Sequence, residues 1–91
     1  MTLADVIRDI HILNRELEAY EEKYGLLSKD FYELYIQGKL PDENIEEIDE
    51  YGQWAAAYRM KLYRESVYEK LARGSSSTLA LPQTRSEVVQ R

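Results

Sequence analysis

The sequence contains no cysteine, one histidine, two prolines and four scattered glycines among its 91 residues. Without cysteine the fold cannot depend on disulfides or on thiolate chemistry. No apolar run approaches the roughly 20 residues that a membrane-spanning helix requires, and the first residues lack the basic and apolar regions of a secretory signal. We therefore expect one small cytoplasmic domain, not embedded in a membrane, with room for a modest core.

Basic residues are outnumbered by acidic ones, which gives a formal net charge of −5. A nucleic-acid-binding surface usually needs a basic face, so we do not expect this chain to bind nucleic acid by itself. The glycines are isolated from one another, which excludes a glycine-rich phosphate loop. Eight tyrosines are many for so short a chain, and tyrosine suits half-buried surfaces and interfaces.

No catalytic or metal-binding pattern is evident. The lone histidine, His11, is preceded three residues earlier by Arg8 rather than by the glutamate that a di-metal helical bundle requires. The acidic run over residues 42–50 does not fit a calcium loop, because Glu47 stands where glycine is needed and Gln53 where glutamate is needed. We expect no catalytic residue, no cofactor, no metal and no enzymatic activity.

Apolar residues recur at three- and four-residue spacing at the start of the chain, which is typical of a helix packed against another helix. They are Leu3, Val6, Ile10, Leu13, Leu17, Tyr20, Tyr24 and Leu27. Thr2 and Asp5 have the spacing of a capping box, and Gly25 suits the position after a helix end. The sequence therefore predicts a helix over Leu3–Tyr24.

A short second helix is predicted from Ser28, a natural N-cap, with Phe31 and Leu34 on one face and Gly38 at its end. The segment that leads to Pro41 is a predicted turn, because proline disfavours helix at the preceding residue.

A long third helix is predicted from Asp42, as its N-cap, to about Arg73. Acidic residues crowd its first half and basic residues its second half, which complements the helix dipole. Two apolar stripes can be traced, of which one could face the domain and the other a partner; a single wide core face is the alternative. The stripes are Ile45, Ile48, Ala55, Tyr58 and Leu62, and Ala56, Met60, Tyr63, Val67 and Leu71.

The run from Gly74 to Thr78 predicts a flexible linker, which divides the chain into a helical domain (residues 1–73) and a linker with a C-terminal tail (residues 74–91). The tail carries Leu79, Leu81, Val88 and Val89, which have no evident place in the core. We expect the tail to contact a partner protein or a neighbouring subunit; a disordered end is the alternative.

The predicted fold is all-α, a coiled-coil-like helical hairpin. Two long helices pack antiparallel with a short connecting helix, and a flexible or partner-docked tail follows. The third helix would measure about 45 Å against about 33 Å for the first, which leaves apolar surface for a homo-oligomer or another protein. A parallel dimer of first helices would set Glu16 against Glu21 and is disfavoured. The expected partner-binding residues are Trp54, Tyr58, Met60 and Tyr63, with the four tail residues; alternatively, the aromatic residues fill the core.

A Tyr-Gly-x-x-Ser-x-x-Phe pattern begins at Tyr24 and is followed by Gly-x-Leu at Gly38, an acidic stretch and Trp-Ala at Trp54. This pattern resembles the antitoxin components of two-gene toxin–antitoxin modules. The resemblance implies a non-catalytic protein that neutralises a toxin through its helical surface and its tail. The alternative is a homo-oligomeric helical adaptor or scaffold without a toxin partner.

Overall fold

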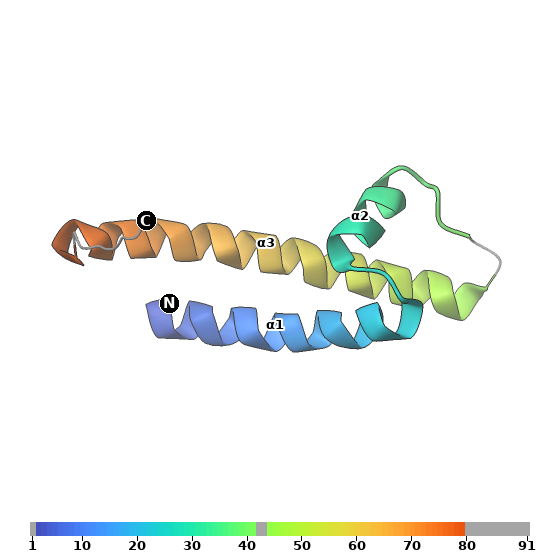
Figure 1. Cartoon of the computed structure of the whole chain (residues 1–91), viewed down its shortest axis with the longest axis horizontal. Helices are drawn as coiled ribbons and strands as arrows, with labels where there is room; N and C mark the ends of the chain where they lie inside the picture. Colours follow the sequence, from blue (N-terminus) through green and yellow to red (C-terminus); the bar gives the residue numbers. More distant parts are fainter. Residues whose placement is uncertain (1, 42–43, 80–91) are drawn as a thin grey trace.

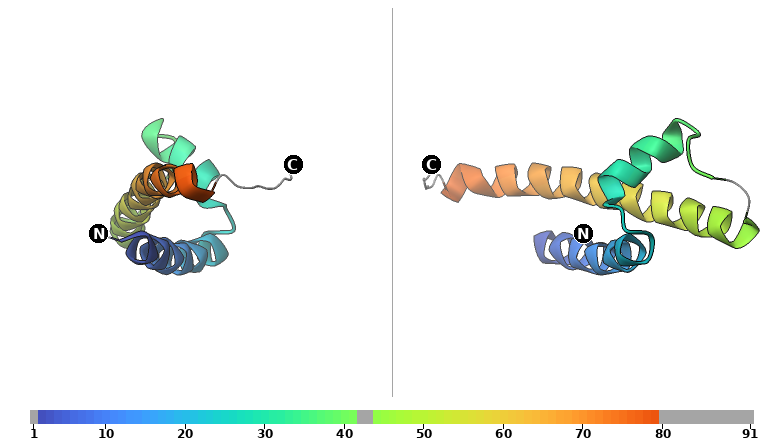
Figure 2. Two further views of the ribbon diagram at one scale, coloured as in Figure 1. Left: turned by 90° about the vertical axis from the view of Figure 1, so that its left-hand side faces the viewer. Right: turned by 45° about the vertical axis from the view of Figure 1, so that its right-hand side comes forward.

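The structure is a computed structural model that describes residues 2–41 and 44–79. It consists of three helices, α1 (Leu3–Tyr24), α2 (Ser28–Ile36) and α3 (Ile45–Leu79). The two long helices lie side by side and run in opposite directions, with α2 against α3 near one end of the pair (Figure 1). Seen end-on, α3 has α1 on one side and α2 on another (Figure 2). The predicted all-α hairpin with a short connecting helix is thereby confirmed.

Helix α1 begins and ends where local sequence signals place it. The Thr2 hydroxyl accepts a hydrogen bond from the Asp5 amide at 3.1 Å, and the Asp5 carboxylate accepts one from the Thr2 amide at 3.2 Å. Gly25 has φ 67°, and its amide donates to the Glu21 carbonyl at 2.8 Å. Both predicted ends are confirmed, because each depends only on residues within one turn.

Helix α2 begins at Ser28, but Ser28 does not cap it. Leu27 occupies the N-cap position and offers no side-chain hydrogen bond. Instead, the Glu21 carboxylate on α1 accepts a hydrogen bond from the Ser28 amide at 2.9 Å, and the Ser28 hydroxyl accepts one from the Trp54 indole at 2.8 Å. The prediction of a Ser28 cap was wrong because partners distant in sequence bind both its amide and its hydroxyl.

The ends of α2 and α3 near the connecting loop are set by Gly38 and Asn44. Gly38 has φ 68°, which glycine adopts without strain, and it lies two residues after the end of α2. The Asn44 side chain accepts hydrogen bonds from the amides of Glu46 at 2.9 Å and Glu47 at 3.2 Å. Asn44 therefore caps α3, and the predicted start at Asp42, which lies outside the described residues, was wrong.

Helix α3 continues to Leu79 rather than ending near Arg73. The predicted linker from Gly74 to Thr78 is helical, so the domain boundary drawn at residue 73 falls inside α3. Glycine and serine cost about 0.5–1 kcal/mol each in a helix relative to alanine. Extension of an existing helix avoids the unfavourable nucleation step, so these residues can prolong α3 where they could not start a helix.

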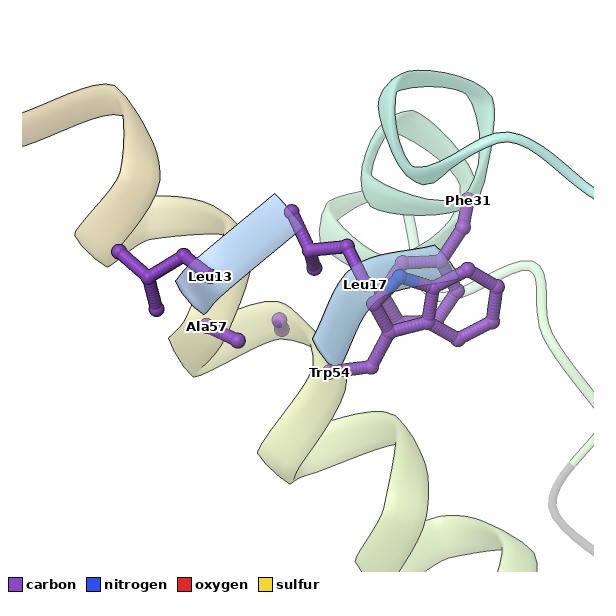
Figure 3. Close-up of a cluster of buried hydrophobic side chains, with 6 residues drawn as sticks. Leu13, Leu17, Phe31, Trp54 and Ala57 are labelled. Atoms are coloured by element: carbon purple, nitrogen blue, oxygen red, sulfur yellow. The ribbon is translucent and has the colours of Figure 1, made fainter. Parts of the chain in front are cut away.

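The core lies where all three helices meet, around the fully buried Trp54. The Phe31 ring stacks on the indole with a centroid distance of 3.8 Å and an angle of 3° between planes. Tyr20 and Tyr24 of α1 stack on it at 5.6 and 5.5 Å. Farther along the hairpin, Leu13 and its neighbours close the α1–α3 contact (Figure 3). Aromatic stacking thus joins α1 and α2 to the same residue of α3.

Polar pairs at three levels join α1 to α3 along the length of α1 and fix their antiparallel register. They are Asp9–Arg64 at 3.2 Å, Tyr20–Gln53 at 3.2 Å and Lys23–Glu50 at 2.8 Å. Each step toward the C-terminus of α1 is matched by a step toward the N-terminus of α3.

Glu50 forms the most extensive of these polar contacts. Both of its carboxylate oxygens lie 2.8 Å from the Lys23 ammonium, and one also accepts a hydrogen bond from the Tyr24 hydroxyl. The hydrogen bonds from Lys23 and Tyr24 hold the pKa of Glu50 below its ordinary value. The same contact raises the pKa of Lys23 and that of Tyr24. Near neutral pH the pair is therefore fully ionised.

Candidate protein-binding surface

The structure separates the four helical residues that were expected to bind a partner. Trp54 is 0 % exposed and forms the centre of the core. It therefore cannot contact a partner, and the prediction that it is a contact residue was wrong. Its aromatic neighbours cover it completely. Tyr58 is half-buried and packs against Tyr32 of α2 with ring centroids 5.2 Å apart. Only Met60 and Tyr63 are open to solvent, at 52 % and 60 % exposure.

The predicted tail residues fall almost wholly beyond the described part of the chain. Leu79 is the last residue of α3, whereas Leu81, Val88 and Val89 lie outside the described residues. Their role as contact residues therefore stays a prediction.

Met60 and Tyr63 belong to a larger apolar surface, formed by Ile12 of α1 with Ala56, Met60 and Tyr63 of α3, which we call the open face. Ala56 is exposed, and Ile12 is 47 % exposed. The spacing of four and three residues places Ala56, Met60 and Tyr63 on one side of α3. Ile12 was not expected as a contact residue. It lies next to the regularly spaced apolar residues of α1, and this position indicates that it widens their apolar surface.

Two shallow hollows indent the surface between α1 and α3 at the open face. One is lined by Asp9, Ile12, Leu13, Met60 and Arg64. The other is lined by Leu13, Glu16, Gln53, Ala56, Ala57 and Met60. Leu13 and Met60 line both hollows, which together form a groove region with apolar residues between polar ones.

The Arg64 side chain contacts both Asp9 of α1 and the Tyr63 ring. The Arg64 guanidinium lies over the Tyr63 ring, 5.7 Å from its centroid. Its buried Nε lies 3.2 Å from the Asp9 carboxylate, in an ion pair that falls short of an aligned hydrogen bond. Arg64 thus links α1 to the exposed aromatic ring of Tyr63.

Helix α2 leaves the open face uncovered because it packs on the other side of α3. Successive residues of an α-helix are turned by about 100°. Tyr51 and Tyr58 therefore lie on one side of the buried residues Trp54 and Ala57, and the open face lies on the other side. Tyr51 and Tyr58 contact the aromatic rings of α2. Exposed contiguous apolar surface with polar rims is typical of protein-interaction sites.

Further hollows lie away from the open face. One is lined by Ile7, Ile10, His11, Glu65 and Tyr68, another by Glu18, Glu21, Glu22, Gly25, Leu26 and Leu27, and another by Tyr35, Gly38, Leu40, Pro41, Ile48 and Tyr51. His11 is exposed at the first. Across residues 2–41 and 44–79, no three histidine, cysteine, aspartate or glutamate side chains gather as metal ligands would. None of the helices in those ranges is both long and apolar enough to cross a bilayer.

Comparisons of the chain with protein-family models, curated proteins and solved structures gave no significant match.

Proposed function

We propose that this chain is a non-catalytic, cytoplasmic protein-binding module, and that its open face and C-terminal tail contact a partner protein. The observation that carries the proposal is the open face itself. Three large apolar side chains, those of Ile12, Met60 and Tyr63, are each about half exposed beside the small Ala56. Interface cores are enriched in aromatic residues and methionine relative to the rest of a protein surface.

We further propose that the partner is the toxin of a two-gene toxin–antitoxin module, which this chain neutralises. The support is the resemblance of its sequence pattern to antitoxins. The residues of that pattern have structural roles here, since Gly25 turns the chain between α1 and α2, and Ser28 and Phe31 both contact Trp54. The residues of the pattern thus support the turn and the core of this chain, and we expect the partner contact at the open face instead.

The proposal can be tested by neutralisation of growth arrest. If the gene beside this one encodes a small basic, nuclease-like protein, that protein is the toxin to express. Co-expression of the wild-type chain should restore growth, and the tagged chain should capture the toxin. The variant with Met60→Glu and Tyr63→Glu should lose both effects, because it places charges in a surface that has to be desolvated on binding.

A matched control places the same two charges elsewhere. Ile36 and Leu62 are also exposed apolar residues, and neither belongs to the open face, so Ile36→Glu with Leu62→Glu should neutralise the toxin like the wild type. Equal activity of both double variants would refute the role of the open face. A chain that restores no growth and captures only copies of itself would favour the alternative, a homo-oligomeric adaptor or scaffold.

A further inference from the structure

We propose that Met60 is an oxidation site that controls the open face. Hydrogen peroxide converts its thioether to a sulfoxide, and the oxidised chain no longer binds its partner. This regulation rests on the proposed function, because it acts on the surface assigned there to partner binding. The evidence for it is the place of Met60 in the open face and the chemistry of the side chains around it.

The sulfur content of the chain makes Met60 a selective target. The sequence contains no cysteine and two methionines, of which Met1 lies outside the described residues. Cysteine thiols, the other sulfur groups that peroxide oxidises, are therefore not present to compete. The indole of Trp54, which is also an oxidisable side chain, is 0 % exposed. In the part of the chain that the structure describes, Met60 is thus the one residue that contains sulfur.

Met60 lies where a change of polarity affects the whole open face. Its side chain is 52 % exposed, which leaves it accessible to a small oxidant. It lines both hollows of the face, and Ala56 and Tyr63 lie about one turn away on the same side of α3. A partner that covers the open face therefore has to exclude water from the Met60 side chain.

The reaction consumes one molecule of hydrogen peroxide for each Met60. The sulfur attacks one peroxide oxygen, and the O–O bond breaks as the S–O bond forms. The proton of the transferred hydroxyl group joins the departing hydroxide, which leaves as water. The sulfur is oxidised by two electrons, and the peroxide is reduced by two. A methionine sulfoxide reductase reverses the change, because two thiols are oxidised to a disulfide while the sulfoxide oxygen leaves as water.

Arg64 offers the sulfoxide oxygen a hydrogen-bond donor inside the open face. It lies four residues after Met60, one turn further along the same side of α3, and both residues line the hollow beside Ile12. The Arg64 Nε is buried, and its ion pair with Asp9 at 3.2 Å lacks the alignment of a hydrogen bond. A thioether sulfur is a weak acceptor, whereas a sulfoxide oxygen is a strong one. Because Nε is buried, an oxygen that binds it lies within the hollow.

Oxidation therefore opposes partner binding in two ways. It makes a flexible apolar side chain polar, a change that disrupts interfaces built on methionine. The new oxygen also occupies part of the hollow, and it loses its bound water when a partner covers the face. The fold is kept, because Met60 is not among the buried side chains of the core.

The first test treats the purified full chain with hydrogen peroxide and maps its peptides by mass spectrometry. Met60 should gain one oxygen, about 16 Da, at a rate within about threefold of that in the chain unfolded in urea, because susceptibility follows exposure. The circular dichroism of the oxidised chain should equal that of the reduced chain. Oxidation of Met60 that is slower by about tenfold or more in the folded chain, or loss of helix on oxidation, would overturn the proposal.

The second test compares the open face in the two oxidation states. A chain with a benzophenone amino acid in place of Tyr63 is added, reduced or oxidised, to an extract of the native host and irradiated. The yield of protein adducts should fall about tenfold on oxidation and recover after treatment with methionine sulfoxide reductase. Equal yields from the two forms would overturn the proposal and leave the open face as an interface. The absence of adducts from both forms would refute the proposed function, and this regulation with it.

Met60→Leu is the matched control, because leucine has a similar volume and no sulfur to oxidise. Each chain is compared with itself, peroxide-treated against untreated, so the comparison does not depend on how tightly the variant binds. The ratio of adduct yields should stay near one for Met60→Leu and fall for the chain that keeps Met60. A fall of the same size in both chains would assign the effect of peroxide to another residue and overturn the proposal.

Discussion

The hydrogen bond between Ser28 and Trp54 gives the sharpest test of how the core is specified. The indole N–H donates to the Ser28 hydroxyl at 2.8 Å, and both residues are buried. Ser28→Ala removes the acceptor but keeps nearly the same volume, so the indole N–H is left unpaired in a site closed to water. Leaving a buried donor unsatisfied costs about 1–3 kcal/mol.

The assay is urea and thermal unfolding followed by circular dichroism at fixed protein concentration. In a chain of this size each kcal/mol shifts the Tm by roughly 4–8 °C, so Ser28→Ala should melt at least several degrees below the wild type. The control is Ser66→Ala, an exposed position within α3. It should melt at the same temperature or slightly higher, because alanine is the better helix former.

A double-mutant cycle isolates the interaction from other effects of each substitution. Trp54→Phe removes the donor, so Ser28→Ala should cost clearly less free energy of unfolding in that background than in the wild type. Equal costs in the two backgrounds, or a Ser28→Ala variant as stable as Ser66→Ala, would refute the conclusion that the core depends on this bond.

Further predictions concern the ends, the seam and the pH dependence of the fold. In the folded chain the pKa of Glu50 is lowered from its ordinary value of 4.5. The Glu50 carboxylate therefore stabilises the fold above pH 4.5, and this stabilisation is lost as the pH falls through the folded pKa. Glu50→Gln should unfold in urea more easily than the wild type at pH 7 but not at pH 2. Gly25→Ala should lower the free energy of unfolding by about 1–2 kcal/mol, because the positive φ strains alanine although nothing lies within 4 Å of the added methyl group; an unchanged melt would contradict the left-handed turn. Leu13→Asp should leave the chain unfolded at ambient temperature, with no cooperative melting transition, because it buries an unpaired charge in the α1–α3 contact. Wild-type-like melting would show that Leu13 is exposed. A chain that ends at Leu79 should keep the wild-type Tm, because the buried residues of the described structure lie between Val6 and Ala57; a drop of several degrees would place the removed segment in the core.

The sequence was sufficient to predict features that depend on neighbouring residues. The capping box of Thr2 and Asp5 and the turn at Gly25 fix both ends of α1 within a few residues, and apolar spacing predicts that α1 needs a helical partner. The antiparallel pairing with α3 then follows from a long second amphipathic segment and from the absence of a favourable parallel dimer.

The sequence was insufficient where contacts distant along the chain decide the outcome. Ser28 looked like a helix cap because nothing local shows that the Trp54 indole, 26 residues away, binds its hydroxyl. Trp54 looked like an interface residue because its burial depends on Phe31 and on two tyrosines of α1. The glycine–serine run resembled a linker, but it extends a helix that is already formed.

The open face was predicted only in part, for a geometrical reason. The stripe that contains Met60 and Tyr63 could be traced in the sequence, as could a second stripe on α3. Which of them stays exposed depends on the side of α3 on which α2 packs, and that is decided by the aromatic contacts of Phe31 and Tyr32. Periodicity alone cannot determine this side.

Photo-cross-linking in the native host tests the central claim, that the open face is a protein interface. A benzophenone amino acid replaces Tyr63, which is 60 % exposed on the open face. As the control it replaces Glu33, an exposed residue of α2. The account predicts discrete protein adducts from position 63, at twice the chain mass for a second copy or at another mass for a partner, and none from position 33. Adducts from position 33 with none from position 63 would contradict it.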